Sequence, residues 1–290
     1  MEYRLREDFG EKKGVISNTH GFLQTYLDGG FKEKWSGYWS PSHKYLDYFA
    51  AKVNGVWLTA ETLEEAEYGK KIVYRHQISS LEIKQEITCP ENLPGFKIES
   101  EIENNSGENK AVRATLETGV DIREKGQDIG SQDYEIEPSQ AGKKVIKDDR
   151  WLSISSEKFN FEEGSCIKEH FPGERQECLI PGDIYCQCEI GPRETKEGEI
   201  VFKTDGSIND EVQSPEGSLR QESLGRTFNY SMESLKNLYY GKNRSGVIAG
   251  HPWFQNYWAR DSFWTALGMI DAGMFEEVEK ILLNFAEREN

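Results

Sequence analysis

The fold of most of this chain is decided by stretches such as Val112-Arg113-Ala114-Thr115-Leu116-Glu117-Thr118-Gly119-Val120-Asp121-Ile122, where even positions are mostly apolar and odd positions mostly polar. Alternate side chains of a β-strand point to opposite faces, so this pattern predicts a strand with one buried face. The segments Leu81–Thr88 and Phe96–Ile102 alternate in the same way. Between about Tyr68 and Lys203 the sequence therefore predicts a large antiparallel sandwich whose sheets each keep one face in water.

The first 60 residues are less regular and rich in aromatic side chains. Val53–Leu58 predicts a hairpin, because its central Asn54-Gly55 pair is typical of a type I′ turn. The aromatic clusters Lys34–Pro41 and Tyr45–Phe49 have two interpretations. They line a groove for sugars, or they belong to the core and its interfaces.

Beyond about residue 210 the apolar period changes from two to three or four, which predicts amphipathic helices. Three helices are marked in this way by the following residues: Leu224, Phe228, Met232, Leu235 and Leu238 before a stop at Gly241; Phe263, Trp264, Leu267 and Ile270 before Gly273; and Phe275, Val278, Ile281, Leu282 and Phe285. We therefore expect a β domain over residues 1–210 and a helical domain over residues 211–290.

Composition narrows the classes of partner. The net charge is −16, from 51 acidic and 35 basic residues, and this charge repels a phosphate backbone, so we expect no nucleic-acid partner. No apolar run approaches the roughly 18 residues of a membrane span, so we expect no membrane partner. Met1–Asp8 has no apolar stretch that could act as a secretion signal, which predicts a cytoplasmic location.

The five cysteines are irregularly spaced, at positions 89, 166, 178, 186 and 188. Cys186 and Cys188 share a predicted strand face with Ile184 and Ile190, so we expect reduced, buried thiols. No second paired motif accompanies them, and no two histidines have ligand spacing, so the sequence predicts no metal. It also contains no phosphate-binding loop, and we expect no cofactor.

The most informative segment for function is Gly250-His251-Pro252-Trp253-Phe254-Gln255-Asn256-Tyr257-Trp258-Ala259-Arg260-Asp261-Ser262-Phe263-Trp264, interpreted here as an aromatic loop that leads into a helix. Aromatic faces stack on the apolar faces of sugar rings, and a guanidinium beside a carboxylate binds neighbouring hydroxyls. Alternatively, Asp261 only caps the helix and Arg260 is an ordinary surface charge.

Val247-Ile248-Ala249-Gly250-His251-Pro252-Trp253-Phe254, followed by Trp258-Ala259-Arg260-Asp261-Ser262-Phe263, resembles the start of the catalytic domain in archaeal and bacterial glycogen debranching enzymes, the amylo-alpha-1,6-glucosidases. The family has Trp-Gly-Arg-Asp-Thr where this chain has Trp258 to Ser262. Ala272–Ala286 is similar to the next helix of those proteins. The resemblance implies an N-terminal antiparallel β-supersandwich followed by the first helices of an (α/α)6 toroid, which is incomplete here.

By this resemblance, Arg260 and Asp261 hold hydroxyls of the non-reducing glucose, and Trp253, Phe254 and Trp258 shape its pocket. The implied substrate is α-glucan, glycogen or similar. Inverting hydrolysis needs two carboxyl groups about 6.5–9.5 Å apart. In the family they come from later helices, so we expect them beyond residue 290 and assign no catalytic residue in this chain.

Three interpretations remain open. In the first, the chain is the N-terminal portion of a debranching hydrolase. In the second, it is the equivalent part of a glucoamylase-like enzyme for α-1,4-glucan, since glucoamylases and trehalases share the Arg-Asp pair. In the third, it is a non-catalytic glucan-binding or split-enzyme subunit, whose toroid a separate chain completes.

Overall fold

The computed structural model describes residues 3–40, 43–127, 133–139, 141–161, 178–205, 222–240, 245–251 and 253–287. The chain divides into two compact units. Met1–Ile16 and Phe22–Asp205 form the first, which we call the β unit, and Ser17–Gly21 and Gly206–Asn290 form the second, the helical unit. The domain boundary predicted at residue 210 lies outside the described residues and stays a prediction.

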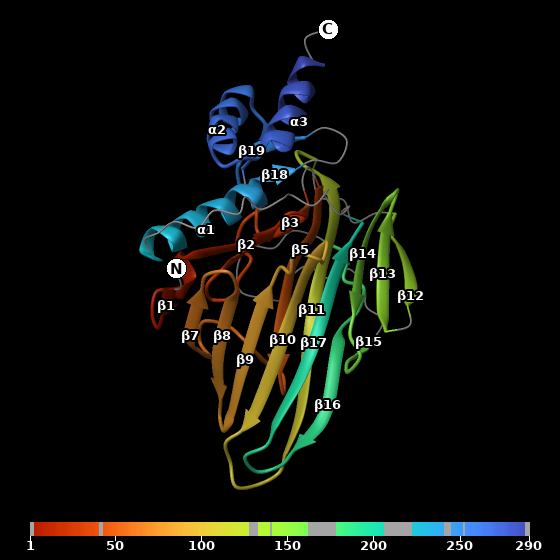
Figure 1. The fold of residues 1–290 in the computed structure, drawn as a ribbon. Coiled ribbons are helices and arrows are strands. Elements are labelled where there is room, and N and C mark those ends of the chain that lie inside the picture. The colour runs from red at the N-terminus through yellow and green to blue at the C-terminus, as the bar shows by residue number, and fades with distance from the viewer. Residues whose placement is uncertain are drawn as a thin grey trace. The chain divides into compact units, whose positions relative to one another are not determined.

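The β unit contains two antiparallel sheets (Figure 1). The nine-stranded sheet has the order β1 (Tyr3–Leu5), β7 (Leu63–Tyr68), β8 (Ile72–Ile78), β9 (Leu81–Thr88), β10 (Gly95–Asn104), β17 (Thr195–Thr204), β14 (Arg150–Ser155), β13 (Gly142–Lys147), β12 (Glu135–Ser139). The eight-stranded sheet has the order β15 (Asn160–Phe161), β16 (Ile184–Ile190), β11 (Lys110–Glu124), β5 (His43–Val53), β4 (Gly37–Ser40), β3 (Gly21–Tyr26), β2 (Lys13–Asn18), and β6 (Val56–Trp57) pairs with β5. A short 3-10 helix covers Phe9–Glu11. The predicted strands Leu81–Thr88, Phe96–Ile102 and Val112–Ile122 are confirmed.

The predicted hairpin at Asn54-Gly55 is also confirmed. Val53 pairs with Val56, and both turn residues have positive φ, 50° for Asn54 and 81° for Gly55, as a type I′ turn requires. The Asn54 side chain accepts a hydrogen bond of 2.8 Å from the backbone N–H of Arg113. This bond ties the turn to the neighbouring strand β11.

The aromatic residues of the first 60 positions belong largely to the core. Tyr38, Trp39 and Tyr45 are buried. Phe49 packs on Phe96, with ring centroids 5.8 Å apart. Of the two interpretations of these clusters, the core interpretation holds for the residues that are buried.

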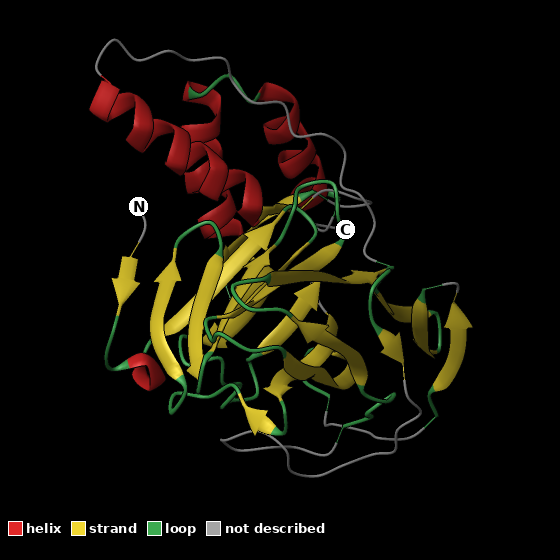
Figure 2. Cartoon of the chain, turned by 90° about the horizontal axis from the view of Figure 1, so that it is seen from below, coloured by secondary structure: helices red, strands yellow, loops and turns green. Residues whose placement is uncertain are grey.

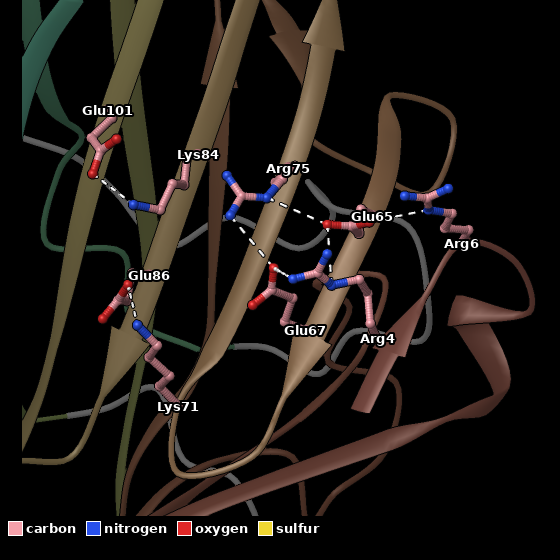
Figure 3. A network of polar contacts seen from close by, with 9 residues as sticks. All are labelled: Arg4, Arg6, Glu65, Glu67, Lys71, Arg75, Lys84, Glu86 and Glu101. Carbon is pink, nitrogen blue, oxygen red and sulfur yellow. Dashed lines mark hydrogen bonds and ion pairs between the residues drawn. The ribbon is translucent and has the colours of Figure 1, made fainter. Parts of the chain in front are cut away.

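The outer face of the nine-stranded sheet carries charged side chains in cross-strand pairs (Figure 3). Arg4 contacts Glu67 at 3.0 Å, and Lys84 contacts Glu101 at 2.7 Å. Pairs of this kind are solvent-screened and contribute little to stability individually. They show that this sheet keeps the predicted wet face.

The eight-stranded sheet departs from that prediction, because β11 is buried on both faces from Thr115 to Ile122. Two of its polar side chains have hydrogen-bond partners: the Tyr48 hydroxyl of β5 donates to Glu117 at 2.7 Å, and the guanidinium of Arg123, two residues along the same strand, donates to Asp121 at 2.7 Å. Burial raises the pKa of Asp121, although the charge of Lys44 opposes this effect. Alternating polarity on β11 therefore marks a buried polar layer and not a solvated face.

The cysteines only partly follow the expectation. The four described ones are free thiols, and Cys178 is buried. Cys186 and Cys188 are half-buried and not core residues, although Ile184 and Ile190 on the same strand are buried. Cys166 lies outside the described residues.

Three long helices belong to the helical unit: α1 (Glu222–Leu238), α2 (Ala259–Asp271) and α3 (Phe275–Ala286) (Figure 2). All three were predicted, whereas the stop expected at Gly241 lies outside the described residues. The segment interpreted as a loop is partly a β-hairpin, which is a correction. Strand β20 (Phe254–Tyr257) of this segment pairs with β19 (Gly246–Gly250), and β19 pairs with β18 (Tyr239–Tyr240) in a small antiparallel sheet.

The core of the helical unit consists of Tyr239, Val247, Ala266, Met269, Met274, Val278 and Ile281. It joins one face of α2 and α3 to β18 and β19. Within the described part of the chain, no helix has both the length and the apolar character needed to cross a membrane.

Candidate functional site

The candidate site begins where strand β20 meets helix α2. The Tyr257 ring lies against Gly246 of β19, where an added Cβ would approach the ring to 2.5 Å. The Tyr257 hydroxyl donates to the carbonyl of Tyr240 at 3.0 Å. Glycine at position 246 therefore allows a close contact that fixes the end of β20.

Ser262 anchors the first turn of α2. It is completely buried, and its Oγ donates to the carbonyl of Val247 at 3.2 Å. Its backbone N–H donates to the carbonyl of Trp258 at 2.8 Å. The sequence offered no sign of this role beyond the hydroxyl that this position shares with the resembled motif. Ser262 holds in place the two residues that precede it.

Those residues, Arg260 and Asp261, are in contact with each other. The Arg260 guanidinium donates to the Asp261 carboxylate at 3.3 Å, and their side chains are 81% and 32% exposed. The helix begins after Trp258, so Asp261 is its third residue. A carboxylate in the first turn interacts favourably with the helix dipole. The N-cap residue is Trp258, and Asp261 makes no capping hydrogen bond to a described residue.

The three predicted aromatic contacts are all exposed. Trp253 is 47% exposed, Phe254 55% and Trp258 52%. Pro252, which precedes them, lies outside the described residues. Large exposed aromatic side chains on one short segment are unusual for the surface of a folded protein. With Arg260 and Asp261 they combine ring faces with a charged pair that can bind hydroxyls.

His251 belongs to the scaffold of the site. Its ring lies edge-on to Tyr240, and its Nε2 lies 3.4 Å from the carbonyl oxygen of Asn237. Burial lowers the pKa of His251 to about 4, so the imidazole is neutral at pH 7. It therefore supplies no proton to a substrate near neutral pH.

Residues able to hold a metal are not grouped anywhere in the described ranges: no cluster of three His, Cys, Asp or Glu side chains occurs there. The candidate site consists of the Arg260–Asp261 ion pair and exposed aromatic side chains. It contains no assigned pair of catalytic carboxyl groups.

Residues 223–290 match the family model described as amylo-alpha-1,6-glucosidase. A search of curated protein sequences finds no match.

Among solved structures, the chain is similar to a bacterial glucoamylase complexed with acarbose, with a TM-score of 0.52 and 12% identity, over 96% of this chain and 50% of the glucoamylase. A protein described as a kojibiose phosphorylase from the human microbiome has a TM-score of 0.43 and 9% identity, over 76% of this chain and 33% of its own. The chain thus spans half or less of the length of these two structures. At these identities the likeness to glucoamylase concerns the fold, which is β followed by α.

Proposed function

We propose that the chain is the N-terminal portion of a glycogen debranching-type glycoside hydrolase, because residues 223–290 match the family model described as amylo-alpha-1,6-glucosidase. Its substrate is branched α-glucan. The β unit is the supersandwich, the helical unit begins an (α/α)6 toroid, and the boundary between the two domains lies near residue 210. The catalytic carboxyl groups for inverting hydrolysis lie beyond residue 290.

The observation that carries the proposal is the exposed Arg260–Asp261 pair beside exposed aromatic rings. In this role the Asp261 carboxylate accepts hydrogen bonds from two neighbouring glucose hydroxyls, and Arg260 donates to a third oxygen. Trp253, Phe254 and Trp258 cover the apolar face of the sugar. The hydrogen bond from Ser262 to the carbonyl of Val247 holds the first turn of α2 in place. The Arg260–Asp261 pair is therefore oriented before substrate arrives, which lowers the entropy cost of binding.

A further observation supports an incomplete toroid. Helix α2 buries Ser262, Ala266 and Met269 but leaves an apolar face exposed. The exposed side chains on α2 and α3 are Phe263, Trp264, Leu267, Ile270, Phe275, Leu282 and Leu283. Helices that are apolar on two sides are normally covered on both. Further helices of the same toroid would cover this face, in the same chain or, in the split-enzyme alternative, in a separate one.

Two alternatives concern substrate and assembly. A glucoamylase-like enzyme for α-1,4-glucan is favoured by the fold likeness to glucoamylase. A non-catalytic glucan-binding subunit is consistent with the absence of an assigned acid and base. The mass of the native protein in its source cells separates the second alternative from the rest. A species near twice 33.3 kDa or more supports a covalently complete enzyme, and a mass equal to this chain supports a subunit.

The decisive test is Asp261→Asn in the complete enzyme, assayed by glucose release from a branched limit dextrin and from linear maltooligosaccharides. The substitution removes the charge of the carboxylate that accepts the two proposed hydrogen bonds from glucose hydroxyls. We expect it to lower kcat/KM by about 10–100-fold. The matched control is Glu276→Gln, which removes an exposed first-turn carboxylate from α3. It should retain full activity.

Unchanged activity of Asp261→Asn would refute the sugar-contact role. Release of glucose only from linear chains would favour the glucoamylase alternative. The isolated 290-residue chain is expected to hydrolyse neither substrate, and clear glucose release by it would contradict the placement of the catalytic carboxyl groups beyond residue 290.

A further inference from the structure

The β unit contains a cavity that the proposed function does not use. It lies between the two sheets and has a volume of about 570 Å³. Small-molecule sites in proteins have volumes of roughly 300–1,000 Å³, whereas interior voids are normally smaller than a few water molecules. The lining is mainly apolar and includes Leu58, Ile83, Ile102, Val112 and Ile200.

Small residues at matching positions of the two sheets line the cavity, and the ring of Phe159, which also lines it, lies against Gly198. In the nine-stranded sheet, Ser100 pairs with Gly198 of β17. In the eight-stranded sheet, Ala114 of β11 pairs with Cys186 of β16. All four line the cavity. The neighbouring inward position Ile98 is large, so the gap is confined to this level of the sandwich.

The cavity also divides the core of the β unit. Ile98, Leu116 and Ile200 on its wall belong to the larger apolar cluster. Val53, Leu58, Ile83, Ile102 and Val112 on its wall belong to a separate, smaller cluster. A gap of this size forgoes dispersion contacts on both sides, which is costly unless another molecule fills it.

Gln85 supplies a polar group inside this apolar space. Its side chain is nine-tenths buried and lines the cavity from β9, where it pairs with Ser100. The Gln85 amide makes no hydrogen bond to any described residue. The Gln85 amide faces this space without a partner from the described residues, so a hydrogen-bonding group inside the cavity could bond to it.

Lys158 supplies a cation at the edge. It is exposed, lines the cavity, and donates to the backbone carbonyl of Glu197 at 3.1 Å. Two other lysines of the lining have acidic partners, Lys52 with Asp183 and Lys196 with Glu194. Lys158 has no carboxylate partner among the described residues. Its ammonium is therefore available for an anionic group at the cavity mouth.

We propose that this cavity binds an aliphatic carboxylate that carries a second oxygen on its chain, such as a hydroxy or oxo fatty acid. The hydrocarbon chain occupies the apolar space between the sheets. The carboxylate remains at the solvent-exposed mouth beside Lys158, where its desolvation cost is small. The oxygen on the chain bonds to the Gln85 amide.

Three probes separate the contributions: 10-hydroxydecanoate, decanoate without the hydroxyl, and decane-1,10-diol without the carboxylate. Binding to the purified chain is measured by titration calorimetry. We expect 10-hydroxydecanoate to bind most tightly, by about five-fold over decanoate for one neutral hydrogen bond. Gln85→Leu should abolish this preference over decanoate. Lys158→Gln should abolish the preference for 10-hydroxydecanoate over the diol. The control Lys84→Gln, on the outer face of the nine-stranded sheet, should not.

A cavity-filling variant tests the location. Ala114→Phe is expected to abolish binding of all three probes, whereas Ala111→Phe, exposed on the opposite face of the same strand, leaves it intact. Thermal unfolding shows that each variant is folded, and Ser100→Leu on the other sheet replaces Ala114→Phe if that variant does not fold. Absence of binding to the unmodified chain, or binding that persists when the cavity is filled, would overturn the proposal and indicate a hydrated gap only.

Discussion

His76 provides a quantitative test of the electrostatics of the β unit. Its side chain is buried on β8, and burial lowers its pKa to about 4 from the ordinary value of 6.5. The ring contacts the hydroxyl of Thr62, with 3.0 Å between Oγ1 and Nδ1. Because the folded pKa lies below the unfolded one, the unfolded state binds more protons between pH 6.5 and 4. The free energy of unfolding therefore falls as the pH falls through this window.

The expected size follows from the two pKa values. Between pH 7 and pH 5 the single imidazole should remove about 2 kcal/mol of stability, approaching about 3 kcal/mol below pH 4. Urea unfolding at pH 7 and pH 5 measures this loss, followed by the fluorescence of the buried tryptophan Trp39. His76→Gln keeps a group able to bond to Thr62 but cannot titrate.

The comparison of slopes isolates the histidine from the carboxylates, which titrate in both proteins. The variant should lose about 2 kcal/mol less than the unmodified chain over the same pH interval. His43→Gln serves as the control: burial also lowers the pKa of His43, which is only half-buried, so its variant should show a smaller change of the same sign. If His76→Gln and the unmodified chain lose the same free energy of unfolding between pH 7 and pH 5, the assignment of His76 as a buried, neutral imidazole is refuted.

Three further expectations concern the site and the scaffold. Asp261→Asn should leave the unfolding temperature within about 2 °C of the unmodified chain, because an exposed pair contributes at most about 1 kcal/mol, and differential scanning calorimetry will show this. Asn104→Ala should destabilise the β unit by about 2 kcal/mol in urea unfolding, because the buried Asn104 amide donates to the carbonyls of Ile190 and Gly191 at 3.0 and 3.1 Å. Gly246→Ala should destabilise the helical unit by about 1–3 kcal/mol in the same experiment, since its methyl group would overlap the Tyr257 ring, and a cost near zero would contradict that contact.

Much of the fold could be predicted because local patterns and tertiary contacts agree. The alternation at Leu81–Thr88 gives alternating buried and half-buried side chains along β9. The double burial of β11 could not be predicted, because Glu117 accepts a hydrogen bond from Tyr48 and Asp121 lies 3.9 Å from the ammonium of Lys44, both far away in sequence. Only pairing of the strands reveals these partners.

The candidate site was predictable to a similar extent. Arg260 and Asp261 were identified from a resemblance, and the structure adds that they contact each other and are exposed. The hairpin of β19 and β20 was missed because aromatic residues interrupt the alternation. The cavity was missed because small inward residues such as Ser100 and Ala114 become informative only when the register across the sheet is known.

The edge strands of the two large sheets affect the behaviour of this chain in solution. An unpaired strand margin can accept a strand from another molecule, which leads to aggregation. The nine-stranded sheet ends at β1, which has three residues including the ion-paired Arg4, and at β12, where Pro138 lacks an amide hydrogen. The eight-stranded sheet ends on one side at β15, which has two residues. Short or proline-containing edge strands limit edge-to-edge pairing at these three edges of the described sheets.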